Sequence, residues 1–64
     1  MSIDNDELRE RLLSLIENEG TTQKFIAKQT KISESMLSLF KNGKSKLMLL
    51  DKERLDKYLI SKGY

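Results

Sequence analysis

The sequence predicts an all-α fold, a compact bundle of four short helices, or of five if residues 46–50 form a turn of their own. Three observations lead to this expectation. None of the 64 residues is proline, so no rigid break interrupts a helix. Apolar residues recur three and four positions apart, which is the spacing of one helix face. Gly20, Gly43 and Gly63 each follow such a segment and can end it.

The first helix is expected from Asp4 to Asn18. Its apolar residues are predicted to form one face, which packs: Leu8, Leu12, Leu13, Leu15 and Ile16. Asp4 or Asn5 can cap its start, because a short polar side chain accepts hydrogen bonds from the free backbone N–H groups there. Gly20 then stops it. We expect this helix to be structural.

Two short helices are expected next, joined by the turn at residues 31–33. Thr21 or Thr22 can cap the first of them, which ends near Thr30. Ser33 can cap the second, from Glu34 to about Lys41. Their expected packing residues are Phe25, Ile26 and Ala27 in the first, and Met36, Leu37 and Phe40 in the second. Asn42 and Gly43 close this pair, since a residue with positive φ commonly follows a helix end.

The last helix is expected to begin at Leu50 or Asp51, with Asp51 as its cap, and to end at Gly63. Leu55, Tyr58 and Leu59 are spaced to pack against the first three helices.

Composition excludes several classes of function. The chain has no Cys and no His, so disulfides, the usual zinc sites and the common nucleophile–base pairs are missing, and we expect neither an enzyme nor a metal or other cofactor. The longest apolar run, Leu47 to Leu50, is far shorter than the ~20 residues that span a membrane. The acidic N-terminus is unlike a secretory signal. We therefore expect one cytoplasmic domain over residues 1–64, with no membrane partner.

Charge is unevenly distributed along the chain. Residues 1–23 carry two arginines against six acids, a net charge of −4, whereas residues 24–64 carry ten cations against four acids, a net charge of +6. The overall net charge is +2. This polarity suits a polyanionic partner facing the C-terminal two-thirds, although a solvated lysine-rich surface explains the charge equally well.

The segment 21–44 carries a specific pattern. It consists of Gln23, Ala27, Ile32, Ser33, Leu37, Phe40 and Gly43. In this joint spacing the chain resembles the helix-turn-helix of the lambda-repressor and Cro-like (XRE-type) DNA-binding family, with a looser match over the first helix. Lys31 departs from the pattern, because the family most often has Gly there. Either the turn avoids positive φ or the lysine accepts some backbone strain.

The resemblance implies that the helix at 34–41 enters the major groove and that its outward residues read bases: Glu34, Ser35, Ser38 and Leu39. The serines can donate to or accept from any base, Glu34 can accept from cytosine N4, and Leu39 can contact a thymine methyl group. Each also has a structural interpretation: solvated serines, a helix N-terminal acid in Glu34, and a core residue in Leu39.

The resemblance also implies contacts to the DNA backbone, from Gln23, Lys41, Asn42, Gly43, Lys44 and Lys46. Gln23 lies at a helix N-terminus, where free N–H groups favour an anion. The resemblance also implies that it braces the next helix. The 42–46 loop is expected to contact phosphates through ammonium groups and backbone N–H groups.

The sequence therefore predicts a sequence-specific double-stranded DNA-binding protein, a small transcriptional regulator of prokaryotic or phage type. A domain this small makes few contacts, so a homodimer on a two-fold site is expected, with Tyr58, Ile60 and Tyr64 as candidates for its surface. Nothing in the sequence indicates a small-molecule effector. The alternative is a protein-binding helical module that uses Leu39 and the Leu47–Leu50 patch.

Overall fold

The computed structural model of the protein describes residues 3–64. This range contains four helices: α1 (Asn5–Glu19), α2 (Gln23–Thr30), α3 (Glu34–Lys41) and α4 (Leu49–Ser61). It contains no β-strand, so the predicted all-α class is confirmed for the described residues. Residues 42–48 connect α3 to α4 and contain no helix, so the described range has no fifth helix.

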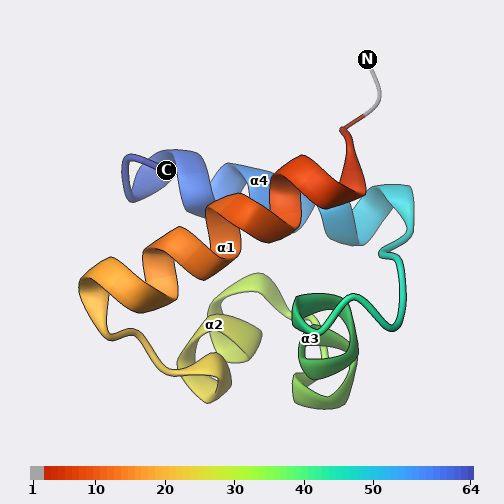
Figure 1. Ribbon diagram of the computed structural model, residues 1–64, viewed down its shortest axis with the longest axis horizontal. Helices are drawn as coiled ribbons and strands as arrows, with labels where there is room; N and C mark the ends of the chain where they lie inside the picture. Colours follow the sequence, from red (N-terminus) through yellow and green to blue (C-terminus); the bar gives the residue numbers. More distant parts are fainter. Residues whose placement is uncertain (1–2) are drawn as a thin grey trace.

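The four helices form two layers (Figure 1). Helices α1 and α4 lie side by side and run in the same direction, and the pair α2 and α3 packs beneath them. Helix α2 contacts α3 and α4, while α1 contacts α3 and α4. The chain packs into an envelope of 27 × 23 × 19 Å. The α2–α3 pair is thus supported from one side and exposed on the other.

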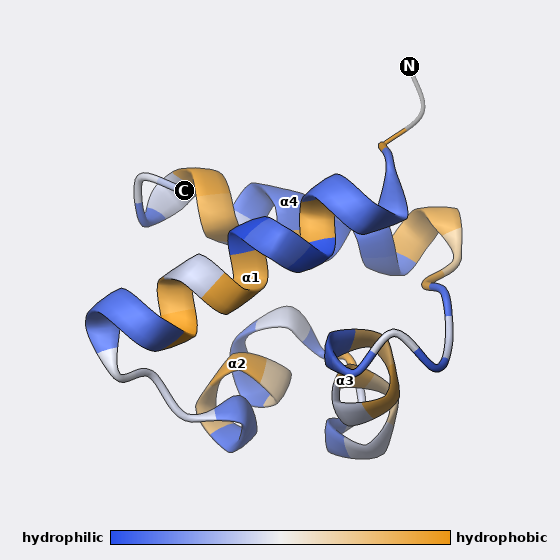
Figure 2. Cartoon of the chain, in the orientation of Figure 1, coloured by the Kyte–Doolittle hydropathy of each residue, from blue (hydrophilic) through white to orange (hydrophobic). Residues whose placement is uncertain are grey.

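The core receives apolar side chains from every helix. Its buried members are Leu8, Leu12, Leu15, Ile26, Ile32, Leu37, Phe40, Leu47, Leu55 and Leu59. Figure 2 shows the hydrophobic stretches of the helices alternating with hydrophilic ones as each helix turns toward and away from this core.

Two residues that were predicted to pack are exposed instead. Leu13 is 39% exposed and Phe25 is 46% exposed. Each is one position from a fully buried neighbour, Leu12 and Ile26, and one step along a helix rotates a side chain by about 100°. The face that α1 buries is therefore narrower than its row of leucines suggests.

The helix caps follow the sequence closely at the first three helices. Asp4, Thr22 and Ser33 each accept a hydrogen bond from a backbone N–H in the first turn, from Asp6, Phe25 and Met36 respectively. Local side-chain chemistry therefore sets these helix starts.

The start of α4 differs from the prediction. The helix begins at Leu49 after Met48, whose side chain makes no capping bond, and Asp51 lies inside the first turn. The cause is a tertiary contact: the Leu47 side chain is buried, and its backbone N–H donates to Asn5 Oδ1 at 3.0 Å. Because Leu47 is anchored on α1, the helix can begin at Leu49, one or two residues earlier than predicted.

Candidate nucleic-acid interface

The turn between α2 and α3 is built from a left-handed residue, a buried residue and a cap. Lys31 has φ 62° and ψ 26°, so the turn keeps the positive φ that the resemblance implies, with lysine in place of glycine. Ile32 is 3% exposed and fixes the turn to the core. Ser33 is extended and caps α3. An L-residue in this conformation is strained by about 1–2 kcal/mol, so the turn stores some backbone strain.

Helix α3 has two different faces. Leu37 and Phe40 are each 1% exposed, and they hold the helix against the core. Glu34 and Ser35 are exposed, Ser38 is half-buried, and Leu39 is 43% exposed, so Leu39 is not a core residue. The outward face therefore combines two hydroxyls, one carboxylate and one apolar side chain.

Gln23 links the start of α2 to the start of α3. Its Nε2 donates to the backbone oxygen of Glu34 at 3.2 Å. Gln23 also lines a shallow surface hollow together with the outward residues of α3: Glu34, Ser35, Ser38 and Leu39. The four residues expected to read bases are thus neighbours in space, and Gln23 belongs to their group rather than to the lysine loop.

The loop after α3 differs from the sequence expectation. The backbone N–H groups of Asn42, Gly43 and Lys44 donate to α3 carbonyls, those of Ser38, Phe40 and Leu39. These bonds cap the C-terminal end of α3, so the three amides are not free to bind phosphate. The side chains of Asn42, Lys44 and Lys46 are exposed and remain available, and Lys41 is half-buried. A phosphate contact from the Gly43 amide therefore requires that this amide share or leave its bond to the Phe40 carbonyl.

Gly43 also has a conformational role. It has φ 75°, and a Cβ atom added there would lie 3.1 Å from Arg9 Nη1. Arg9 comes from α1 and also forms an ion pair with Asp6 at 3.4 Å. The fold thus places an additional cation against the 42–44 loop. Sequence analysis missed Arg9, because only the packing of α1 against α3 brings it there.

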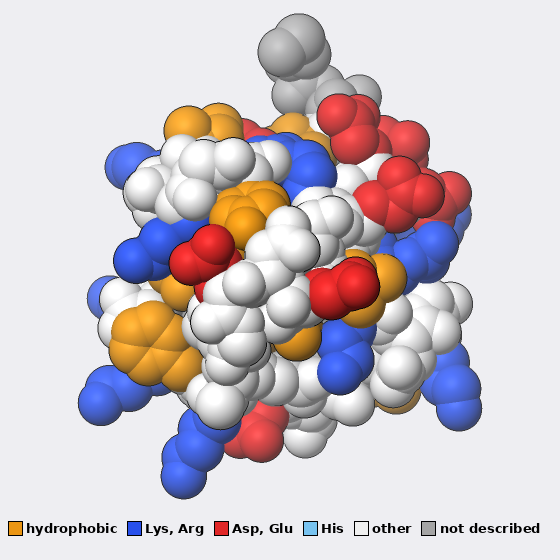
Figure 3. All heavy atoms as spheres, turned by 60° about the vertical axis from the view of Figure 1, so that its left-hand side comes forward, with side chains coloured by type: hydrophobic (Ala, Val, Ile, Leu, Met, Phe, Trp, Pro, Cys, Tyr) orange, Lys and Arg blue, Asp and Glu red, His pale blue; other side chains and the backbone are white. Residues whose placement is uncertain are grey.

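Acidic side chains are concentrated at one end of the molecule, whereas the cations are spread more widely. Figure 3 shows a group of acidic side chains beside the N-terminal end, and Lys and Arg side chains projecting at the left, the right and the bottom of the view, with further acidic side chains between them. The acids of the first turns of α1 include Asp4, Asp6, Glu7 and Glu10, all exposed. The sequence asymmetry is therefore partly retained as a spatial one.

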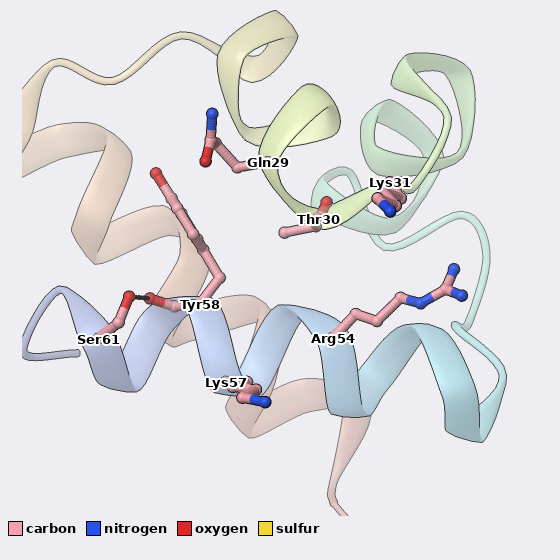
Figure 4. A pocket seen from close by; sticks show the side chains of 7 residues that line it. All are labelled: Gln29, Thr30, Lys31, Arg54, Lys57, Tyr58 and Ser61. Carbon is pink, nitrogen blue, oxygen red and sulfur yellow. Dashed lines mark hydrogen bonds between the residues drawn. The ribbon is translucent and has the colours of Figure 1, made fainter.

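A second hollow lies between the end of α2 and α4 (Figure 4). Its lining residues are Gln29, Thr30, Lys31, Arg54, Lys57, Tyr58 and Ser61. Burial raises the pKa of the Tyr58 hydroxyl. Lys31, Arg54 and Lys57 line it near the C-terminal end of α2, where free carbonyl groups favour positive charge. Their charged ends point in different directions (Figure 4), so they form no common site for an anion.

Within residues 3–64, no helix has the length and apolar character needed to cross a membrane, and no group of acidic side chains is arranged to hold a metal ion. In comparisons with known proteins, no family model matches the chain, and no curated protein and no solved structure is significantly similar to it.

Proposed function

We propose that the chain binds double-stranded DNA through a helix-turn-helix formed by α2 and α3, and acts as a small transcriptional regulator of prokaryotic or phage type. The observation that carries the proposal is the outward face of α3. Its inner residues Leu37 and Phe40 are buried, while Glu34, Ser35, Ser38 and Leu39 share one surface hollow with Gln23. A helix held in this way can enter the major groove with its first residues toward the base edges.

The side chains of this face set its expected selectivity. Hydroxyls, one carboxylate and one leucine give weaker discrimination than an arginine bound to guanine or an asparagine bound to adenine. Contacts with the DNA backbone therefore supply most of the affinity, through Gln23 and the side chains of the loop. The side chains assigned to phosphate here are Lys41 at the end of α3, and Asn42, Lys44 and Lys46 in the loop.

Salt dependence tests this proposal. With about 4–6 phosphate contacts, the affinity for a generic duplex should fall roughly 10²–10³-fold between ~50 and ~200 mM salt, because binding releases condensed counterions. Fluorescence anisotropy with a labelled duplex measures this change. Lys44→Ala should weaken binding to every sequence and flatten the salt dependence, whereas Lys62→Ala, which removes the same charge at the far end of α4, should leave both unchanged. Absence of binding at low salt, or equal losses in the two variants, would contradict the proposal.

A protein-binding module is the second candidate, and one observation favours it. Met48, Leu49 and Leu50 are 79%, 55% and 60% exposed, although Leu47 is buried and leaves the patch. Leu39 and Leu49 line separate hollows, so the apolar residues do not form one depression for a partner. Binding of a protein partner through these residues would be nearly independent of salt, in contrast to DNA binding.

A further inference from the structure

The outer side of α4 carries a second surface that DNA binding does not use. Leu50, Glu53, Lys57 and Ile60 follow one another at intervals of three, four and three residues, the spacing of a helix–helix seam. All four are exposed, with Leu50 60% and Ile60 63% exposed, while Leu55 and Leu59 on the opposite side of α4 are fully buried. Two large apolar residues thus flank two opposite charges on one free stripe.

We propose that this stripe pairs with the same stripe of a second copy of the chain, with the two α4 helices antiparallel. A two-fold axis at the level of residue 55 places Glu53 opposite Lys57 of the second copy. The same axis places Leu50 opposite Ile60 of the second copy. The Glu53–Lys57 contact and the Leu50–Ile60 contact are each formed twice, because the interface is self-complementary. In this one register, each of the eight side chains therefore faces a side chain of opposite charge or of matching polarity.

The charge order also selects the orientation. A parallel pair in register would place Glu53 against Glu53 and Lys57 against Lys57, which is destabilising. Within residues 3–64, the side-chain ion pairs join Arg9 to Asp6, Arg11 to Asp56 and Arg54 to Asp51, so Glu53 and Lys57 are both unpaired in the single chain. The antiparallel pair supplies the partner that each lacks.

The size of the surface indicates a weak association. A contact between two helices of 13 residues is smaller than the ~1,200–2,000 Å² of a stable interface. We therefore expect a dimer that forms only at high protein concentration. Of the three predicted dimer candidates, Ile60 lies on this stripe, whereas Tyr58 and Tyr64 are half-buried against the core.

Charge reversal tests the pairing in solution, without DNA, so its outcome is independent of the proposed function. Sedimentation equilibrium of the wild-type chain over a concentration series should show reversible dimerisation. Glu53→Lys and Lys57→Glu, each alone, should weaken association about tenfold or more, since each places like charges opposite each other twice. The double variant E53K/K57E should recover the wild-type dissociation constant. An equimolar mixture of the two single variants should form a heterodimer.

A matched control separates this seam from general surface charge. Lys62→Glu also reverses one lysine near the end of α4 but lies off the stripe, and it should leave association unchanged. Far-UV circular dichroism checks that each variant keeps its helices. A wild-type chain that stays monomeric at ~1 mM, single reversals without effect, or a double variant that does not recover would each overturn the proposal.

Discussion

The two layers of the molecule use their polar side chains in opposite ways. In the α1–α4 layer, polar groups bond across the layer: Arg11 donates to Asp56 and to the backbone oxygen of Tyr64, Lys52 donates to the backbone oxygen of Ile3, Asn5 accepts from Leu47, and Tyr64 donates to Glu19. In the α2–α3 layer, the Gln23–Glu34 bond is the side-chain hydrogen bond that joins the two helices among the described residues. Polar side chains thus join the helices of the α1–α4 layer, whereas the side chains of Glu34, Ser35 and Ser38 on α3 form no hydrogen bond to another helix within residues 3–64.

The largest expected effect separates the two faces of α3. Leu37→Ala should destabilise the fold by about 2–5 kcal/mol, because the Leu37 side chain is only 1% exposed and its removal leaves a cavity in the core. Leu39→Ala, two positions along, should change stability by less than about 0.5 kcal/mol but weaken DNA binding about three- to tenfold. Urea unfolding and anisotropy measure the two quantities. A large stability loss in Leu39→Ala would show that the outward face of α3 supports the fold. It would contradict the contrast drawn here between the two layers.

The next effect tests whether the upper layer depends on its polar contacts. Arg11→Met should cost about 1–3 kcal/mol of stability, since the guanidinium bonds both Asp56 and a backbone oxygen and its side chain is 22% exposed. Arg54→Met is the matched control: its ion pair with Asp51 spans 3.7 Å on the surface of one helix and should contribute less than about 0.5 kcal/mol. Equal effects in urea unfolding would show that the bonds between α1 and α4 add nothing beyond surface pairing.

The predictable features of this fold are those that neighbouring residues decide. The cap at Ser33 and the bounds of α2 and α3 follow from side chains within a few positions and are confirmed. At the other two starts the structure selects Asp4 rather than Asn5, and Thr22 rather than Thr21. The start of α4 was predicted wrongly, because it depends on the bond between Leu47 and Asn5, far apart in sequence. Contacts of this kind exist only once helices pack.

In the candidate site, too, some features follow from neighbouring residues and others from the packing of separate helices. Helical periodicity is enough to place Ser35, Ser38 and Leu39 on one side of α3, opposite Phe40. The bond from Gln23 to Glu34 and the approach of Arg9 to the loop require the packing of separate helices. The backbone bonds that occupy the Gly43 amide depend on how α3 ends, which composition does not specify. Which side chains face outward was therefore predictable, and which polar groups remain free was not.

The smallest expected effect concerns the helix ends of the two layers. Helix α1 ends at Gly20 with φ 68°, and Gly63 near the end of α4 has φ 86°, whereas α2 ends at Lys31 with φ 62°. Glycine adopts this conformation without steric penalty, so among residues 3–64 the left-handed strain lies in the α2–α3 layer.

Replacing Lys31 measures that strain. Lys31→Gly should be more stable than Lys31→Ala by about 0.5–1 kcal/mol. Removing the β-carbon relieves the steric strain of the left-handed conformation, and this gain exceeds the stability lost because glycine raises the entropy of the unfolded chain. Both variants remove the same charge from beside Arg54 and Lys57, so their difference isolates the backbone. Paired urea unfolding curves measure it. If Lys31→Ala were equally stable, the left-handed turn would be unstrained, and the two layers would end their helices at the same energetic cost.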